Sequence, residues 1–385
     1  MQVRTKYLWS RCITLIVTAF MSFGVHGQMS ITSPADFLGY QLGDKFTPHH
    51  QVARYTERLH QELKVSELIS YGTTAEGRPL QLLVMSHPQN MKELASFKMQ
   101  HLSRVQGGSG IEKWDDVALV WLSYNVHGNE AVCTEAALEV MHKIAEDVAD
   151  EEDWLKHVIV LVDPCLNPDG HDRYTNWFNQ YASLTPNADP LAYEHDEPWP
   201  GGRPNHYLFD LNRDWAWQTQ SESQMRSQVY HEWMPHVHCD YHEMGYNSPY
   251  YFAPAAEPFH ESITDWQRAF QEEIGNATAQ DFDARGQLYY TRESFDLLYP
   301  SYGDTYPIYN GSIGMTYEQG GSGSAGVLVL QNSGDSLSLD QRIENHVSSS
   351  FEALFTSARL SSALVNQMAE FFEMNRTNPW GRFHA

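Results

Sequence analysis

Apolar and polar positions alternate along this chain in two kinds of segment, which predict an order of strands and helices. Continuous apolar runs at residues 117–124 and 158–162 are typical of strands buried on both faces of a sheet. Residues 235–241 and 312–317 are also predicted as strands. Helical spacing of apolar residues predicts helices at 49–64, 91–105, 130–149, 221–233, 259–279 and 346–373.

The order of these elements predicts the fold class. Residues 66–71 and 79–85 are predicted as two strands around a turn at 76–78, and strands and helices then alternate. Alternation of this length predicts an α/β fold, with a mixed, largely parallel central sheet flanked by helices on both faces. The stretch 167–205 is rich in glycine, proline and asparagine, and we expect a long loop there.

The first 27 residues have the pattern of a secretory signal peptide. Three basic residues within the first eleven positions precede an apolar run at 12–25, and Gly27 lies just before the expected cleavage near Gln28. The run is too short for a transmembrane helix. We therefore expect a secreted or periplasmic protein with no membrane association after signal removal. A retained membrane anchor is the alternative.

Net charge limits the possible binding partners, and the cysteine content limits the possible disulfide bonds. The formal charge is −24, which a nucleic-acid backbone would repel, so we expect no nucleic-acid partner. After signal removal three cysteines remain, at Cys133, Cys165 and Cys239. An odd number does not fit a full disulfide framework, and we expect buried thiols.

Histidine and carboxylate side chains follow the predicted strands at the ends where open α/β sheets bind ligands. His127 and Glu130 follow the run 117–124, His242 follows 235–241, and Glu318 follows 312–317. Imidazole and carboxylate groups suit zinc, and three protein ligands with one open position are typical of a catalytic zinc site. His238 is an alternative to His242, because the two residues share strand parity.

A carboxylate beside such a metal would have a defined task. Zinc lowers the pKa of a bound water to about 7, and a second carboxylate is then needed to take the proton and return it. Glu318 is placed for this role. The alternative reading of His127 and Glu130 is a surface histidine and a glutamate that complements a helix N-terminus.

The sequence resembles the zinc carboxypeptidases of the carboxypeptidase A type, from about residue 45 to 375. The resemblance rests on five motifs in the family's order. They are His127-x-x-Glu130, the Asn-Pro-Asp-Gly turn at 167–170, Asn212-Arg213 with Trp215 shortly after, His242 at a strand end, and Thr316-x-Glu318. The Asp-Tyr-His-Glu-Met-Gly form at 240–245 is most similar to large bacterial members.

The resemblance implies roles for these residues. His127, Glu130 and His242 would hold one Zn²⁺ per chain, with Glu318 as general base and then acid. Asn212 and Arg213 would bind the terminal carboxylate of peptide or protein C-termini, for which a guanidinium fork is well suited. From the resemblance together with the signal pattern, we expect the chain to divide into a signal peptide at 1–27, a leader at 28–45, a catalytic domain at 46–375 and a C-terminal tail at 376–385.

Two departures from the family concern arginines. The family usually places an arginine after a tryptophan in the long loop, where it polarises the scissile carbonyl, but here Phe178 follows Trp177. Arg173 is the candidate replacement, with a plain surface charge as the alternative. Animal members also have an arginine between the first histidine and the glutamate, where this chain has Asn129. Both changes leave the oxyanion more dependent on the metal.

A tyrosine that caps the substrate in the family is matched here by Tyr299, a candidate catalytic residue chosen by its distance before Glu318. Tyr302 is the rival, and a packed aromatic cluster is the simpler reading of this tyrosine-rich stretch.

Three functions remain open from the sequence. The first is a metallocarboxypeptidase that acts on protein-derived peptides, and the second is a cell-wall peptide hydrolase with the same zinc site. The third is a non-catalytic, zinc-dependent binding module. The pair Asn212-Arg213 favours an exopeptidase, because an endopeptidase needs no clamp for a terminal carboxylate. Glu318 argues against a module without activity.

Overall fold

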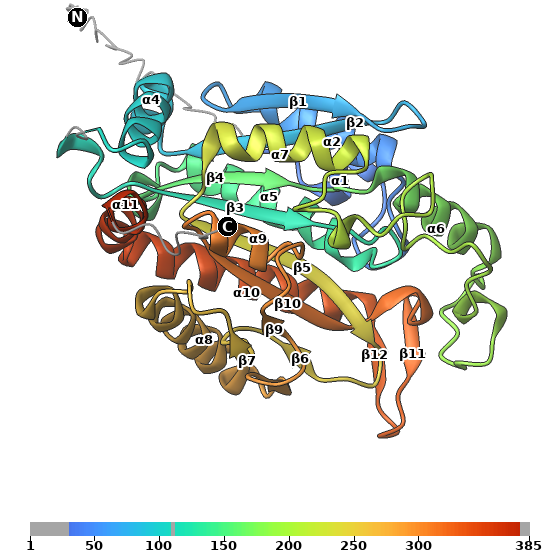
Figure 1. The fold of residues 1–385 in the computed structure, drawn as a ribbon. Coiled ribbons are helices and arrows are strands. Elements are labelled where there is room, and N and C mark those ends of the chain that lie inside the picture. Colours follow the sequence, from blue (N-terminus) through green and yellow to red (C-terminus); the bar gives the residue numbers. More distant parts are fainter. Residues whose placement is uncertain (1–30, 109–111, 378–385) are drawn as a thin grey trace, which may run out of the picture. The chain divides into compact units, whose positions relative to one another are not determined.

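A mixed sheet of eight strands forms the centre of the protein within residues 31–108 and 112–377, which the computed structural model describes. Figure 1 shows the sheet with its helices. In sheet order the strands are β1 (Glu67–Thr73), β2 (Pro79–Ser86), β4 (Val158–Asp163), β3 (Ala118–Tyr124), β5 (Val237–Gly245), β10 (Ile313–Gly321), β6 (Tyr250–Tyr251) and β8 (Tyr289–Tyr290). The strands from β4 through β3 and β5 to β10 are parallel to one another. The predicted α/β class with a mixed, largely parallel sheet is confirmed.

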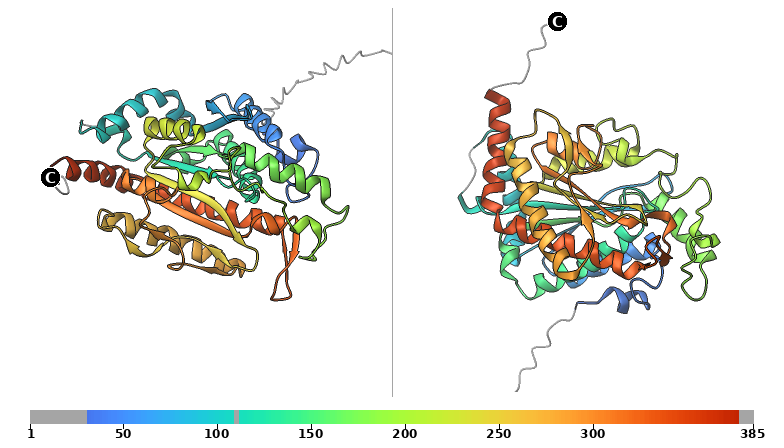
Figure 2. Two further views of the ribbon diagram at one scale, coloured as in Figure 1. Left: turned by 45° about the vertical axis from the view of Figure 1, so that its right-hand side comes forward. Right: turned by 90° about the horizontal axis from the view of Figure 1, so that it is seen from below.

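Helices cover both faces of this sheet (Figures 1 and 2). The larger core lies between the sheet and α2 (His49–Glu62), α5 (Val132–Ala149), α8 (Asp265–Arg285) and α10 (Leu339–Arg359). The opposite core lies against α4 (Leu94–Val105), α7 (Ser221–Trp233) and α11 (Ser361–Thr377). The two cores account for the continuous apolar runs of the inner strands.

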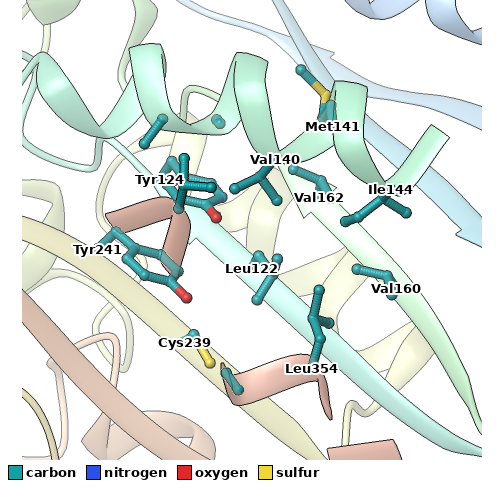
Figure 3. Close-up of a cluster of buried hydrophobic side chains, with 14 of the residues drawn as sticks. Leu122, Tyr124, Val140, Met141, Ile144, Val160, Val162, Cys239, Tyr241 and Leu354 are labelled. Atoms are coloured by element: carbon teal, nitrogen blue, oxygen red, sulfur yellow. The ribbon is translucent and has the colours of Figure 1, made fainter. Parts of the chain in front are cut away.

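The alternation of side chains along β3 shows how one strand serves both cores. Val120 and Leu122 belong to the larger core, whereas Leu119 and Trp121 belong to the other. Figure 3 shows Leu122 among residues of β4, α5 and α10. Because successive side chains of a strand point to opposite faces, both alternating sets of β3 side chains face a core, and they are apolar from Ala118 to Leu122.

The remaining α-helices within the described residues are α6 (Pro168–Tyr181), which has 14 residues, and the five-residue α1 (Pro34–Leu38), α3 (Pro88–Lys92) and α9 (Thr305–Tyr309). Two small sheets pair β7 (Ala256–Phe259) with β9 (Asp296–Leu297) and β11 (Leu328–Leu330) with β12 (Ser336–Ser338). No strand of these two small sheets exceeds four residues, so none has enough positions for a periodic pattern.

The prediction of an unbroken loop over residues 167–205 is wrong, because α6 occupies its first third. The side chain of Asn167 caps this helix by accepting a hydrogen bond from the Gly170 amide at 3.0 Å, and Pro168 occupies the first helical position. Tyr174 and Phe178, four residues apart, are buried in the larger core. The sequence Asn-Pro-Asp-Gly therefore begins a helix here.

Several predicted boundaries also shift. The helix expected at 346–373 is two helices, α10 and α11, which meet at Leu360. The first begins earlier than expected, because Ser338 and Gln341 form a reciprocal capping box. The strands β5 and β10 run on to Gly245 and Gly321, so His242 and Glu318 lie within strands and do not follow them.

Residues 31–45, assigned from the sequence to a leader, pack onto the same compact unit as the rest. Thr32 bonds both carboxylate oxygens of Glu62 in α2, through its amide and its hydroxyl. The predicted signal peptide at 1–27 and the tail beyond Thr377 lie outside the described residues.

Two further observations bear on the expectations from composition. Cys133, Cys165 and Cys239 are free and buried, as predicted. Within residues 31–108 and 112–377, no helix has both the length and the apolar character needed to cross a bilayer.

Candidate active site

One cavity of about 410 Å³ opens at the carboxyl ends of β3, β5 and β10. The turn after β3, the two strands β5 and β10 and the segment 203–213 contribute most of its charged groups. Its wall includes His127, Glu130, Arg203, Asn212, Arg213, His242, Met244, Asp296, Tyr302, Asp304, Thr316 and Glu318. The structure thus brings together the four residues that the sequence places at strand ends.

His127, Glu130 and His242 form a buried cluster whose ligand atoms face one another. The Nδ1 atom of His127 is 2.9 Å from Glu130 Oε1 and 3.2 Å from His242 Nδ1, and His242 Nδ1 is 3.0 Å from Glu130 Oε2. Tetrahedral zinc with bonds of about 2.0–2.1 Å to nitrogen places neighbouring ligand atoms about 3.3 Å apart. The spacing therefore fits one zinc ion.

The partners of the outer ring nitrogens strengthen this fit. His127 Nε2 is 3.0 Å from Asp210 Oδ1, and His242 Nε2 is 2.8 Å from Asp240 Oδ2. A carboxylate can only accept, so each Nε2 carries a proton, and the neutral tautomer of each ring would then present an Nδ1 lone pair to the centre. In that tautomer the two imidazole lone pairs and the Glu130 carboxylate face one another, and a cation between them would stabilise this arrangement. Carboxylates behind the histidines are typical of metal sites.

Asn125 shapes the turn that carries His127 and Glu130. It has a positive φ of 62°, and its side-chain amide donates to the carbonyls of both residues at 3.0 Å. Glu130 Oε2 also accepts the Glu243 amide at 2.9 Å. Arg342 in turn holds the Glu243 carboxylate in a fully buried ion pair at 2.8 Å. These supports were not predicted from the sequence, although asparagine is a residue type that tolerates left-handed backbone.

Glu318 lies in β10 opposite His242 of β5. Its carboxylate lines the cavity and its Oε2 atom has no hydrogen-bond partner within the described residues. The pKa of Glu318 is raised to about 8, mainly by burial. The charge of His242 acts in the opposite direction, and the nearby Glu130 acts in the same direction as burial. A divalent cation in the cluster would lower this pKa, because it favours the ionised form.

Asn212 and Arg213 line the cavity from a short 3₁₀ turn, Leu211–Arg213. Asp210 caps this turn by accepting the Asn212 amide at 2.9 Å. The Asn212 side-chain carbonyl accepts the Gly303 amide at 2.8 Å, and the Arg213 guanidinium stacks over the Tyr302 ring at 4.6 Å. The turn thus presents an amide and a half-exposed guanidinium at the cavity wall.

Arg173, the sequence-based candidate for polarising the carbonyl, is not among the residues that line the cavity. Its guanidinium donates to the carbonyl oxygens of Gly201 at 2.9 Å, Pro204 at 3.3 Å and Asn205 at 3.2 Å. Because its guanidinium is bound to backbone carbonyls and does not line the cavity, the assignment of Arg173 to the reacting carbonyl is corrected.

Arg203 is the arginine that reaches the cavity instead. Its Nη1 lies 3.0 Å from Glu130 Oε1 and its Nη2 lies 3.1 Å from Asp210 Oδ2. The sequence analysis did not single it out. The signal that could have found it is the pair of glycines immediately before it, which permits the close backbone approach that carries it to the site.

Of the two candidate tyrosines, the structure places Tyr302 in the cavity wall, and Tyr299 is not among the lining residues. The Tyr299 hydroxyl accepts a hydrogen bond from the exposed Trp217 indole at 2.8 Å. The two tyrosine rings are in contact, with centroids 4.9 Å apart. Tyr302, the alternative to Tyr299 from the sequence, is therefore the one of the two tyrosines that lines the cavity.

A family model described as zinc carboxypeptidase matches residues 52–307. His127, Glu130, Arg213 and His242 fall within the match, whereas Glu318 lies beyond it and is positioned by the register of the sheet. A search of curated protein sequences gives no match.

Solved structures of carboxypeptidases share the fold. The carboxypeptidase A from Helicoverpa armigera is 18% identical over 83% of this chain and 75% of its own, with a TM-score of 0.55. A metallo-carboxypeptidase from Burkholderia cenocepacia is 16% identical over 83% and 70%, with a TM-score of 0.52. The thrombin activatable fibrinolysis inhibitor is 14% identical over 89% and 81%, with a TM-score of 0.54. At identities this low, the structural matches establish a common fold and nothing more specific.

Proposed function

The chain belongs to the zinc carboxypeptidase family, and from this premise we propose that it is an active metallocarboxypeptidase that hydrolyses C-terminal peptide bonds. One observation carries the proposal. The cluster of His127, Glu130 and His242, the carboxylate of Glu318 and the guanidinium of Arg213 all line the same cavity. A site for a metal, a proton acceptor and a carboxylate binder are therefore within reach of one substrate.

Substrate binding in this proposal begins with the terminal carboxylate. Arg213 would bind this carboxylate by donating parallel hydrogen bonds from its planar guanidinium, and the Asn212 amide would contribute a further donor. The stacking of Arg213 over Tyr302 fixes the plane of the guanidinium. Tyr302 would then cover the bound residue from the cavity wall.

A zinc ion held by His127, Glu130 and His242 would supply Lewis acidity and an activated water at neutral pH. Glu318 accepts the proton of the attacking water and delivers it to the nitrogen of the leaving residue. The guanidinium of Arg203 donates to the carbonyl oxygen as negative charge develops there, which takes the place of the arginine missing after Trp177.

The wall beside this machinery bears on the preferred terminal residue. Asp304 is buried, and its two oxygens accept hydrogen bonds from the hydroxyls of Thr316 and Thr305, both at 2.8 Å. Burial raises the pKa of Asp304, and the charge of Asp240 adds to this. Together with Asp296 it favours a terminal side chain that carries a cation or donates hydrogen bonds.

The alternatives from the sequence differ from this proposal in substrate or in activity. A cell-wall peptide hydrolase would use the same zinc site on crosslinks that contain D-residues. A zinc-dependent binding module would use the ligands without Glu318. The half-exposed guanidinium of Arg213 in the cavity supports recognition of a free carboxylate, and hence the exopeptidase. We further propose, from the signal pattern at residues 1–27, that the protein acts in a secreted or periplasmic location.

A digest of a peptide library, read by mass spectrometry, tests the proposed function. With zinc added we expect loss of single residues from the C-terminus and no internal cleavage. Chelation should abolish the activity and added zinc should restore it. Cleavage only of peptides with D-residues would favour the cell-wall hydrolase, and zinc-dependent binding without any cleavage would favour the binding module.

A further inference from the structure

We propose that Arg173 and Glu197 are positioning residues that hold the segment 201–210 in place for catalysis and for metal binding. The inference rests on the proposed function, because this segment supplies two groups of that site. Arg203 contacts Glu130 at 3.0 Å, and Asp210 contacts the outer nitrogen of His127 at 3.0 Å. The segment contains no α-helix or strand, so side-chain contacts must fix its place.

Arg173 holds the segment from one side. It projects from α6 and donates to the carbonyls of Gly201, Pro204 and Asn205 at 2.9–3.3 Å. These three carbonyls flank Arg203 along the chain. A guanidinium offers five donors in a fixed plane, whereas an ammonium is a single point charge with rotating donors. The contact pattern therefore requires arginine at this position and would not be restored by lysine.

Glu197 holds the segment from the other side and joins it to the metal-binding turn. Its Oε1 accepts the Gly202 amide at 2.5 Å, and its Oε2 accepts the side-chain amide of Asn129 at 2.7 Å. Asn129 lies between the ligands His127 and Glu130. The position at which animal carboxypeptidases carry an arginine is thus used in this chain to tie the loop to the turn.

Three glycines make the junction tight at the level of the backbone. A Cβ atom on Gly202 would lie 2.5 Å from the Gly170 carbonyl oxygen, and one on Gly128 would lie 2.6 Å from the Gly202 carbonyl oxygen. Such separations are shorter than real Cβ contacts, so three backbone segments touch where no side chain fits. Asn167 adds a hydrogen bond from its amide to the Arg203 carbonyl at 3.1 Å.

These contacts imply a specific consequence of loosening the segment. Arg203 would lose its fixed direction toward the cavity, and Asp210 would hold His127 less firmly. Since neither Arg173 nor Glu197 lines the cavity, an effect of Arg173 on turnover must pass through the segment, and an effect of Glu197 must pass through the segment or through Asn129. Substitution of a residue that supports metal ligands in this indirect way typically lowers activity or metal affinity by about 10- to 100-fold.

A double-mutant cycle tests the proposal in the zinc-loaded full chain. We expect Arg173→Ala to lower kcat by about 10- to 100-fold, with Arg173→Lys nearly as impaired. In the Arg203→Ala background the same change should cost much less, because the group it positions is already absent. Arg376→Ala is the matched control, since Arg376 also donates to a backbone carbonyl, that of Val105 at 3.0 Å. Equal losses from Arg173→Ala with and without Arg203 would overturn the proposal.

Amide hydrogen exchange in the zinc-free protein gives a readout that does not depend on activity. We expect Arg173→Ala and Glu197→Gln each to speed exchange in peptides that cover residues 197–210, with the strands of the sheet unchanged. The Glu197→Gln variant keeps the side-chain size and serves where Arg173→Ala does not fold. Unchanged exchange in this region in both variants would overturn the proposal even if the protein proves not to be a carboxypeptidase.

Discussion

Glu318 of β10 lies opposite His242 of β5 in the register of two parallel strands. Paired residues on neighbouring strands project to the same face, so the carboxylate lies beside a candidate metal ligand within the same cavity. His238 shares this parity but pairs with Gly314, and its ring packs against Trp215 with centroids 5.3 Å apart. Position along the strand, which parity does not report, separates the two histidines.

Removal of a histidine ligand should abolish metal binding. We expect the purified mature protein to carry about one zinc per chain, and His127→Ala or His242→Ala to lose it on dialysis, because two remaining ligands hold zinc poorly. Elemental analysis of the dialysed protein measures this. His157→Ala, a half-exposed histidine outside the cluster, is the control. Full zinc occupancy in His242→Ala would move the assignment to His238.

The carboxylates behind the histidines should tune zinc affinity without being ligands. Asp210→Asn and Asp240→Asn each replace an acceptor of a ring N–H by an amide, and we expect zinc affinity to fall by about 10- to 100-fold in each. Competition with a metal-chelating dye measures the affinity. The surface variant Asp153→Asn, which loses only an ion pair with Lys156, should bind zinc as the parent does. Unchanged affinity in both variants would contradict the assigned proton positions.

Loss of the carboxylate clamp should depend on the substrate. Arg213→Ala removes a charged hydrogen-bond donor worth about 1.5–3 kcal/mol, so kcat/KM for peptides with a free C-terminus should fall by about 10- to 100-fold, mainly through KM. Amidated peptides should be much less affected. Arg359→Ala, an exposed arginine paired with Glu273, controls for loss of charge. An equal loss for both substrates would argue against an exopeptidase.

The sheet and most of its helices could be predicted from the sequence, because apolar periodicity survives over five or more residues. The runs that form β3 and β4 have no polar interruption before their last residues. The two-residue strands β6 and β8 have no pattern to detect, since their place comes from pairing with distant segments. The start of α6 was not predicted, because the sequence Asn-Pro-Asp-Gly occurs both in turns and at the beginning of helices.

The candidate metal-binding cluster could be placed from spacing and strand ends, whereas the arginine at the cavity could not. Arg203 contacts Glu130 from an irregular segment that is itself in contact with Arg173, Glu197 and two glycines of other turns. Contacts of this kind depend on tertiary structure and leave no periodic signal. Arg173 does not line the cavity, although it contacts the segment that carries Arg203 to the cavity wall.

A buried carboxyl outside the active site should make stability depend on pH. Burial raises the pKa of Glu135 from 4.5 to about 7, partly offset by hydrogen bonds from the amide and hydroxyl of Thr47. Between about pH 4.5 and 7 the unfolded chain releases this proton while the folded protein keeps it. The free energy of unfolding therefore falls as the pH rises through this window and levels off above it.

Glu135→Gln should remove this contribution, because the amide does not ionise and can keep both contacts with Thr47. We expect the variant to be more stable than the parent by about 1–3 kcal/mol at pH 8 and similar to it at pH 4.5. Urea unfolding at both pH values measures the difference. A stability difference that is the same at the two pH values would contradict the assignment.

The exchange of one oxygen for nitrogen at Glu318 tests the catalytic account most directly. Glu318→Gln preserves the side-chain size, and the metal ligands are untouched, so the variant should fold and bind zinc as the parent does. It cannot accept the proton of the attacking water, and we expect kcat to fall by about 10²- to 10⁴-fold with KM little changed. Zinc content and steady-state kinetics are measured on the same sample. A zinc-replete Glu318→Gln protein with the parent's kcat would contradict the account.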